Sequence, residues 1–446
     1  MICSPDSIRA WPVDGTSRGV PGLAAPIPIE SVAKQEWNLL RGDLALPVLV
    51  LRDERFRHNL RSMRRLVEAL GLSLAPHGKT PMAPQLFEEY VREGGAWGVS
   101  VATVPQAAVV AAGGMRHVLI ANQVIGRANV EKLAALRAAF PHRGFPSFVD
   151  SVDALRQLVR FGRQRLVGED RFDILIEVGA AGARTGARSR DQVDAIVTAA
   201  RDHAEAVRVV GVGCYEGAIS HPDPRENLAA VDAYLDFAVE AFNRVAGAGL
   251  LDGSAEAILT GGGSVWFDRV ARAFAEARLD HPARRILRCG SYPFMDHRKY
   301  RRKLAAIDAR GGLPGMPADS TSALEAFLPS LELWAAVQSV CDPGRAIVAM
   351  GRRDLPYDQG LPIPLRQYRE GDLLHTLSED EAANPFRVEK ADDQHAYLSF
   401  PEGSNIRVGD LFAFGISHPC TAFDKWPIVF RADPAFNVTG AVKTFF

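Results

Sequence analysis

The chain has 446 residues, a hydrophobic share of 47% and a formal net charge of −1, so it is long enough for two globular domains. Its near-neutral, interspersed charge argues against a nucleic-acid or membrane partner. The five cysteines are scattered and form no disulfide framework, no apolar run approaches the roughly 18 residues of a membrane span, and residues 1–20 lack the apolar stretch of a signal peptide. We therefore expect a cytoplasmic protein.

The first regular elements follow a mixed segment of about 45 residues. Leu46–Leu51 is a β-type run, and Asp53–Leu70 has the apolar period of a helix. Strand-like runs then alternate with helical stretches. The eight runs are Leu72–Ala75, Trp97–Ala102, His117–Ala121, Ser147–Val149, Asp173–Val178, Val207–Cys214, Ala257–Leu259 and Arg285–Leu287. This α/β pattern predicts a TIM-type (β/α)8 barrel over residues 46–310, with an open doubly wound sheet as the alternative.

A change of composition marks the end of the barrel. Gly311–Pro317 is typical of a linker. Beyond it the helical period is largely lost, and short apolar runs alternate with Gly, Pro and Asp. These runs are Leu331–Ser339, Ala346–Met350, Ala396–Phe400 and Leu411–Ile416. The pattern predicts a smaller, mostly β domain over residues 311–446.

The first barrel strand ends in Ala75-Pro76-His77-Gly78-Lys79-Thr80. Pro76 lacks an N–H and Gly78 tolerates unusual backbone angles, so the strand stops and Lys79 is placed at its end. A lysine held there out of bulk water has a lowered pKa and can act as an amine nucleophile. A solvated turn lysine is the alternative.

Two Gly-containing turns follow the seventh and eighth strands. They are Thr260-Gly261-Gly262-Gly263-Ser264 and Arg288-Cys289-Gly290-Ser291-Tyr292. Successive glycines let backbone N–H groups converge on an anion, and barrel enzymes frequently bind phosphate at these positions. Together with Lys79 after the first strand, the turns predict a phosphorylated aldehyde cofactor held as a Schiff base, which is pyridoxal 5'-phosphate. Two tight turns without a ligand are the alternative.

A third group is Ser417-His418-Pro419-Cys420. In an extended segment His418 and Cys420 point the same way, and imidazole and thiolate are both good Zn²⁺ ligands. Two ligands do not close a structural site, so we expect an open site that also takes a substrate oxygen. A buried cysteine beside a surface histidine is the alternative.

Six motifs in this order resemble the D-serine dehydratase-like family, which also includes D-threonine aldolases and enzymes acting on D-3-hydroxyaspartate. The motifs are Pro76-His77-Gly78-Lys79-Thr80, Arg184-Thr185-Gly186, Tyr215-Glu216-Gly217, Thr260-Gly261-Gly262-Gly263, Asp392-Asp393-Gln394-His395 and His418-Pro419-Cys420. The resemblance covers nearly the whole chain from about residue 45. It implies an alanine-racemase-type (fold-type III) enzyme with a barrel, a β domain built with help from the N-terminal arm (residues 1–45), and a homodimer with active sites between subunits.

The resemblance also implies roles for individual residues. Lys79 becomes the Schiff-base lysine, Arg184 and Tyr215 lie near the cofactor ring, and His418 and Cys420 become the metal ligands. The implied phosphate contacts are Thr260, Gly261, Gly262, Gly263, Gly290 and Tyr292. Gln394 and His395 are candidates for the substrate or metal surroundings, with a surface loop as the alternative, whereas His77 is interpreted as a packed strand-end residue. Which residue faces the pyridine nitrogen stays open.

The reaction that the resemblance implies is the dehydration and deamination of a D-3-hydroxy amino acid such as D-serine to a 2-oxo acid and ammonia. Lys79 would remove the Cα proton, and the metal would help the β-hydroxyl to leave. Alternatives are an aldolase giving glycine and an aldehyde, a racemase, and a non-catalytic cofactor carrier. Thiolate ligation favours zinc, although another divalent metal stays open. For the family's aldolases the resemblance implies a metal site made of His and Asp, so the Cys420 thiolate favours the dehydratase. Extra segments around Leu313–Ser322 and Arg352–Leu365 leave the preferred substrate open.

Overall fold

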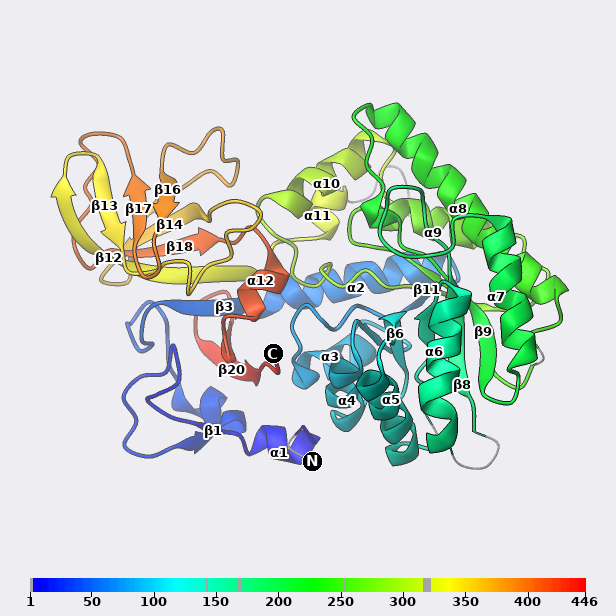
Figure 1. Ribbon diagram of the computed structural model, residues 1–446. Coiled ribbons are helices and arrows are strands. Elements are labelled where there is room, and N and C mark those ends of the chain that lie inside the picture. The colour runs from blue at the N-terminus through cyan, green and yellow to red at the C-terminus, as the bar shows by residue number, and fades with distance from the viewer. Residues whose placement is uncertain (1–2, 142, 167–169, 252, 316–321) are drawn as a thin grey trace.

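The structure is a computed structural model that describes residues 3–141, 143–166, 170–251, 253–315 and 322–446. Figure 1 shows a strand-rich part and a helix-rich part, with strand β3 (Val48–Arg52) and helix α2 (Asp53–Ala69) running from one to the other. Part of the expected linker, Met316 and Pro317, lies outside the described residues. No helix in the described ranges is both long and apolar enough to cross a membrane.

Eight parallel strands form the centre of the helix-rich part, in the order β4-β11-β10-β9-β8-β7-β6-β5. They are β4 (Ser73–Leu74), β5 (Val99–Val101), β6 (Val118–Gln123), β7 (Ser147–Val149), β8 (Phe172–Glu177), β9 (Val207–Gly213), β10 (Ile258–Gly261) and β11 (Arg284–Leu287). A bridge between His77 and Ser100 joins the two ends of this order, because the Gly78 N–H donates to the Ser100 carbonyl at 2.7 Å. The predicted barrel is therefore confirmed, and each of the eight predicted runs overlaps one of these strands.

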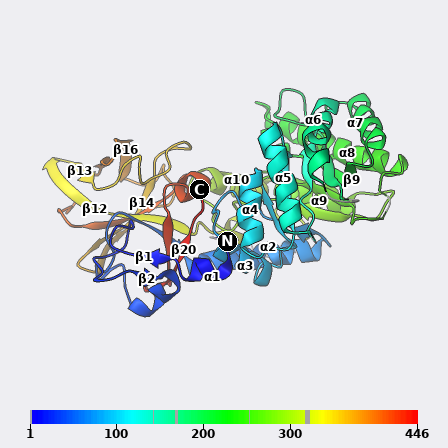
Figure 2. The same ribbon diagram turned by 60° about the horizontal axis from the view of Figure 1, so that its bottom comes forward.

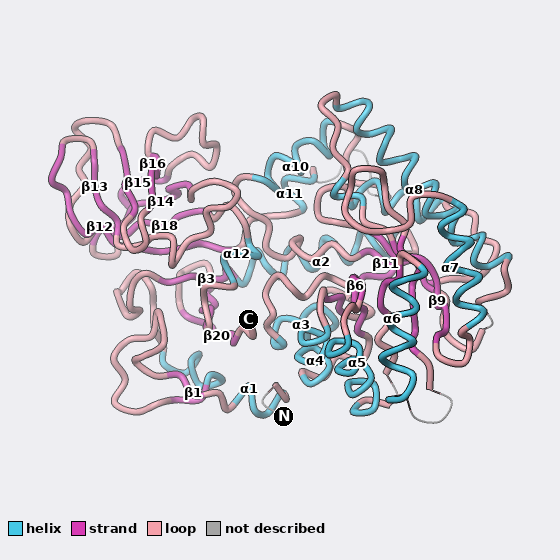
Figure 3. The backbone as a smooth tube through the Cα atoms, in the orientation of Figure 1, coloured by secondary structure: helices cyan, strands magenta, loops and turns pink. Residues whose placement is uncertain are grey.

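Helices surround the strands on the outside (Figures 2 and 3). They are α3 (Pro84–Arg92), α4 (Val104–Ala112), α5 (Arg127–Ala139), α6 (Val152–Gly162), α7 (Arg190–Asp202), α8 (Pro224–Gly247), α9 (Phe267–Glu276) and α10 (Lys299–Ala309), followed by the short α11 (Ala323–Ala326). Side-chain caps begin several of them: Thr103, Ser151 and Ser189 each accept a backbone N–H of the first turn. All six residues of β8 are buried, as expected for a parallel strand covered on both faces.

The strand-rich part is one ten-stranded sheet, which confirms the predicted β domain. Its members besides β3 are β12 (Leu331–Asp342), β13 (Arg345–Val348), β14 (Ile363–Arg369), β15 (Asp372–Thr376), β16 (Arg387–Ala391), β17 (Ala396–Ser399), β18 (Leu411–Gly415), β19 (Ile428–Ala432) and β20 (Val438–Lys443). Strand β3 lies antiparallel to β12 and parallel to β19. The β-type run Leu46–Leu51, which was predicted within the barrel (residues 46–310), thus pairs with the second sheet and not with the barrel strands.

A buried ion pair fixes β3 in this sheet. Glu332 on β12 is fully buried and accepts hydrogen bonds from Arg52 at the end of β3 (3.3 Å) and Arg366 on β14 (2.5 Å). Burial would raise the pKa of Glu332, but the two guanidinium groups lower it to about 2. The ionised carboxylate therefore links β3 to two strands that lie 280 or more residues later in the sequence.

The N-terminal arm packs against the same sheet. It contains α1 (Pro5–Arg9), a short hairpin of β1 (Pro12–Val13) and β2 (Ile27–Pro28), and the 3-10 helix η1 (Ile29–Gln35). Val13 and Val32 of the arm lie in one apolar cluster with Val48, Trp334 and Phe430. The arm and β20 lie beside each other in Figure 1, and η1 contacts β20.

Candidate active site

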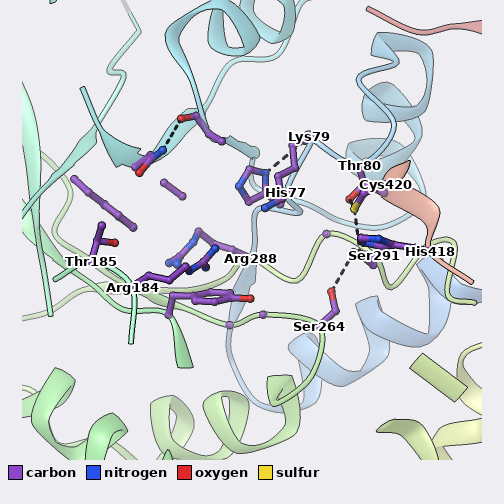
Figure 4. A pocket seen from close by; sticks show the side chains of 18 of the residues that line it. His77, Lys79, Thr80, Arg184, Thr185, Ser264, Arg288, Ser291, His418 and Cys420 are labelled. Atoms are coloured by element: carbon purple, nitrogen blue, oxygen red, sulfur yellow. Dashed lines mark hydrogen bonds between the residues drawn. The ribbon is translucent and has the colours of Figure 1, made fainter. Parts of the chain in front are cut away.

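A cavity of about 460 Å³ opens at the C-terminal ends of the barrel strands and is closed on one side by the start of α12 (Pro419–Phe423) (Figure 4). The sequence-predicted residues that line it are Lys79, Arg184, Tyr215, Gly262, Gly263, Gly290, His418 and Cys420. Residues from both parts of the chain, nearly 340 positions apart, are therefore brought to one place.

Lys79 lies between the two ends of this cavity, next to His77 (Figure 4). Much of its side-chain surface is free, but that surface faces the cavity. Burial lowers the pKa of Lys79, and Arg184 and Arg288 lower it further, against an opposing effect of Cys420. The amine is therefore deprotonated more readily than that of an ordinary lysine, as a nucleophile or base requires.

His77 supports this lysine. Its Nδ1 accepts the Lys79 backbone N–H at 3.4 Å, and burial, with the nearby cations, holds the pKa of the imidazole well below its usual range. The ring is therefore neutral. Gly290 approaches His77 so closely that a Cβ on it would lie 2.6 Å from the His77 Cβ, so only glycine fits there.

The glycine-rich turn after β10 is held by a carboxylate. The N–H groups of Gly262 and Gly263 donate to the Glu216 side chain at 3.2 and 2.6 Å, and Glu216 is fully buried. Burial raises the pKa of Glu216, while these N–H groups and Arg288 oppose that rise. The two amides that were expected to meet a phosphate thus have an acceptor within the chain.

Two serines supply other donors at the same place. Ser264 and Ser291 line the cavity from the turns after β10 and β11, and the Ser291 N–H donates to the Ser264 hydroxyl at 3.1 Å. Two arginines also face the cavity: Arg184 stacks on Tyr215 at 4.0 Å, and Arg288 donates to the Cys214 carbonyl. A lysine, two hydroxyls on paired turns and two cations fit a phosphorylated aldehyde.

Three of the predicted cofactor contacts are placed in the walls of the barrel and do not line this cavity. The Thr260 hydroxyl donates to the Ile286 carbonyl and accepts from Arg288. A Cβ on Gly261 would meet the Cys214 sulfur at 2.7 Å, and Tyr292 is fully buried in a T-shaped ring contact with Phe327. Their roles toward a cofactor stay predictions.

Gln394 and His395 lie on the exposed turn between β16 and β17 and do not line the cavity either. The backbone of this turn is anchored, because the Arg352 and Arg353 N–H groups donate to the Asp392 and Asp393 carbonyls. Their assignment to the substrate or metal surroundings also stays a prediction.

The predicted metal pair shares one corner of the cavity with Thr80 and Ser291 (Figure 4). His418 is extended, but Cys420 is the second residue of helix α12, so the expectation of one extended segment is wrong for half of the pair. Proline at the first helical position starts the helix there. The side chains still converge, since both line the cavity.

The chemistry of this corner suits an open metal site. Asp358 pairs with His418 Nδ1 at 2.6 Å, an arrangement that fixes the ring and leaves Nε2 for a metal. Burial raises the pKa of Cys420, but hydrogen bonds with His418 and Thr80 bring it below its usual value. Within the described ranges there is no group of three or more His, Cys, Asp or Glu side chains that could hold a metal. A metal here would keep open positions.

Several lining residues were missed by the sequence analysis as site residues. They are Asn122, Glu177, Ser264, Arg288, Ser291, Lys299 and Tyr300. Arg288, Ser264 and Ser291 stand in the two quoted turns, so their place in those turns was a usable signal. Lys299 and Tyr300 begin α10, and nothing local in the sequence distinguishes them from other helix residues.

Two family models match the chain: the alanine racemase N-terminal domain over residues 52–258 and the putative serine dehydratase domain over residues 330–431. A 3-hydroxy-D-aspartate aldolase of Paracoccus denitrificans (strain Pd 1222) is 27% identical over 341 residues, which cover 76% of this chain and 79% of the relative. A D-threonine aldolase of Arthrobacter sp. is 27% identical over 362 residues, 81% of this chain and 83% of the relative.

Among solved structures, D-threo-3-hydroxyaspartate dehydratase from Delftia sp. HT23 superimposes with a TM-score of 0.68 at 22% identity, covering 92% of this chain and 99% of that chain. A mutant of D-threo-3-hydroxyaspartate dehydratase has also been solved in a metal-free form. The structural likeness extends over both parts of the fold.

Proposed function

We propose that the chain belongs to the D-serine dehydratase-like family of alanine-racemase-type pyridoxal phosphate enzymes and that it is a zinc-assisted dehydratase of a D-3-hydroxy amino acid. The protein is a lyase that acts on a D-hydroxy amino acid, in keeping with its relatives. The observation that carries the finer proposal is the pair His418 and Cys420 in the same cavity as Lys79. The products would be a 2-oxo acid and ammonia.

The residues present fit the cofactor. Lys79 would anchor it, Ser264 and Ser291 would contact its phosphate, and Arg184 with Tyr215 would flank its ring. When bound, pyridoxal phosphate supplies an electron sink for the carbanion formed at Cα. Arg184 and Arg288 add positive charge to the cavity, which favours the binding of an anionic cofactor and of a substrate carboxylate.

Lys79 is the base of the proposed reaction. Its Nζ would take the Cα proton, and its lowered pKa leaves more of the amine unprotonated near neutral pH. The neutral His77 ring beneath the Lys79 backbone does not compete for that proton, because burial disfavours its charged form.

The hydroxyl group would leave from the other side of the cavity. His418 and Cys420 would hold a divalent metal there, oriented through Asp358. Such a metal supplies Lewis-acid stabilisation of the leaving oxygen, which is a poor leaving group at neutral pH. A thiolate ligand favours zinc over magnesium or manganese.

An aldolase is the second candidate, and the two aldolases among the relatives favour it. The same cavity would then break the Cα–Cβ bond and release glycine with an aldehyde. The Cys420 thiolate favours the dehydratase, because the resemblance implies a metal site made of His and Asp for the family's aldolases.

A substrate panel separates the two reactions. The holoenzyme would be incubated with D-serine, D-threonine and both D-3-hydroxyaspartates, with and without chelator, while ammonia, 2-oxo acid and glycine are measured. Ammonia and 2-oxo acid in equal amounts, lost on chelation, are expected. Glycine as the main product would instead identify the enzyme as an aldolase.

We also propose that the enzyme is a homodimer. The exposed turn with Gln394 and His395 lies away from the cavity of its own chain, which supports a site completed by a second subunit. Light scattering of the purified protein should give twice the chain mass of 48.4 kDa.

A further inference from the structure

A second cavity, of about 580 Å³, lies between the start of α10 and the loop that precedes β16. We name it the α10 cavity, because Arg301 and Arg302 of α10 line it together with His297 and Arg298, which directly precede that helix. Arg387 of β16 lines it as well. None of the described residues lines both this cavity and the active site. It has no part in the function proposed above.

His297 is the most unusual residue of the α10 cavity. Only 2% of its surface is exposed, yet neither ring nitrogen has a hydrogen-bond partner among the described residues. Burial lowers the pKa of His297 to about 4, so the neutral ring presents one N–H donor and one acceptor. Leaving buried polar atoms unpaired costs free energy, so the ring requires an explanation.

The His297 ring packs against Gly415 at the end of β18. The His297 N–H donates to the Ile416 carbonyl at 3.1 Å, and a Cβ on Gly415 would lie 2.5 Å from the imidazole Cγ. The imidazole therefore has little freedom to turn toward another partner. A polar group that reaches the ring from the cavity would satisfy it.

The charges around the ring are only partly matched. Arg298 pairs with Glu381 at 2.5 Å and Arg301 with Glu379 at 3.1 Å. The third acidic residue of the wall, Asp380, caps its own turn by accepting the Ala382 N–H.

Arg302 and Arg387 complete the wall, and both are exposed. Neither has an ion-pair partner in the part of the chain that the structure describes. Two unmatched guanidinium groups and an unpaired imidazole therefore face the same space. A guanidinium group presents a planar fork of donors that matches phosphate and carboxylate oxygens.

We propose that the α10 cavity is a binding site for a small oxyanion with at least two negative charges, held by Arg302 and Arg387 and by an N–H of His297. Phosphate, phosphate monoesters and dicarboxylates share this chemistry. The cavity exceeds the size of phosphate itself, so it has room for the body of a larger molecule that carries the anionic group.

Isothermal titration of inorganic phosphate into the cofactor-loaded enzyme tests the site, because the loaded enzyme already has its own phosphate group in the barrel. One phosphate per chain is expected. Arg302→Gln and Arg387→Gln should each weaken binding about tenfold, the loss typical of one charged hydrogen-bonded contact. Arg61→Gln, at an exposed position of α2 that lines neither cavity, is the matched control and should bind as the unchanged protein does.

Glycerol phosphate and malonate, added as competitors, distinguish a phosphate ester from a dicarboxylate as the preferred oxyanion. His297→Phe keeps a ring of similar size and removes both nitrogens, so it should also weaken phosphate binding. If His297→Phe does not fold, the two arginine variants test the proposal without it. Absence of phosphate binding at millimolar concentration, or unchanged binding in the Arg302→Gln/Arg387→Gln double variant, would overturn the proposal.

Discussion

Two lysines face the active-site cavity, Lys79 after the first barrel strand and Lys299 at the start of α10. We predict that borohydride treatment of the cofactor-loaded enzyme fixes the cofactor on Lys79 alone, because burial and two arginines lower the pKa of that amine. Peptide mass spectrometry identifies the modified residue, and Lys79→Ala should abolish the label while Lys299→Ala retains it. A label on Lys299 would contradict the assignment.

Glu216 also acts at the scale of one residue. Glu216→Ala would leave the N–H groups of Gly262 and Gly263 without an acceptor, at a cost of about 1–3 kcal/mol each. We predict that the apo-protein then binds pyridoxal phosphate at least about tenfold more weakly, because the turn loses its anchor. Fluorescence titration measures this affinity. Glu389→Ala, at an exposed position of β16, serves as the control. Equal affinities would show that the carboxylate does not position the turn.

The same turn shows what sequence reasoning reached and what it missed. Successive glycines indicated a special backbone, and Gly262 does adopt a φ of 102°. A Cβ on Gly262 would meet no atom of the protein closer than 3.5 Å. The constraint is the backbone angle. The contact with Glu216 depends on packing between residues 46 positions apart, which local patterns do not encode.

At the scale of elements, the spacing of apolar residues predicts helices and strands correctly where the pattern of burial is regular. The eight barrel strands are short apolar runs between amphipathic helices, and each was predicted close to its position in the structure. Strand β3 has the same local pattern, but its partners β12 and β19 lie some 280 or more residues away. Similarly, His418 and Cys420 were predicted in one extended segment, but the proline between them begins α12. His418 is therefore extended and Cys420 is helical.

The ion pair that holds β3 leads to a stability prediction. Glu332→Gln should lower the free energy of unfolding by about 3–5 kcal/mol at pH 7, because Arg52 and Arg366 would stay buried without a counter-charge. Urea unfolding followed by tryptophan fluorescence measures the loss. Glu402→Gln, at an exposed position, should change it little. A loss below about 1 kcal/mol would contradict the assigned role.

The pH dependence of that loss has a definite sign. The pKa of Glu332 is lowered to about 2 in the folded state, against about 4.3 when unfolded. Its contribution is therefore fully present above about pH 5 and is lost as the pH falls toward 2. The difference between the unchanged protein and Glu332→Gln should narrow by about 1.5 kcal/mol between pH 7 and pH 3. A difference that widens on acidification would contradict this linkage.

At the scale of the whole molecule, the active site joins two parts of the fold. Lys79 and the glycine turns belong to the barrel, whereas His418 and Cys420 follow β18 of the second sheet. We therefore predict that Cys420→Ala retains the cofactor, with unchanged absorption, but loses bound zinc. It should also lose more than 90% of ammonia release, because Lewis-acid stabilisation of the leaving oxygen is worth several kcal/mol. Metal analysis and a coupled ammonia assay measure both. Cys341→Ala, at an exposed position, is the control. Full turnover without metal would return His418 and Cys420 to a structural role.

The position of β3 also has a consequence for the order in which the protein matures on the ribosome. All barrel strands have been synthesised by residue 287, so the barrel has its full complement of strands while the last third of the chain is still being made. Strand β3 leaves the ribosome before any barrel strand but remains without its sheet partners until β12 and then β19 emerge. During that interval the apolar strand β3 is open to chaperones and to neighbouring chains, and it is covered only after the whole barrel has been synthesised.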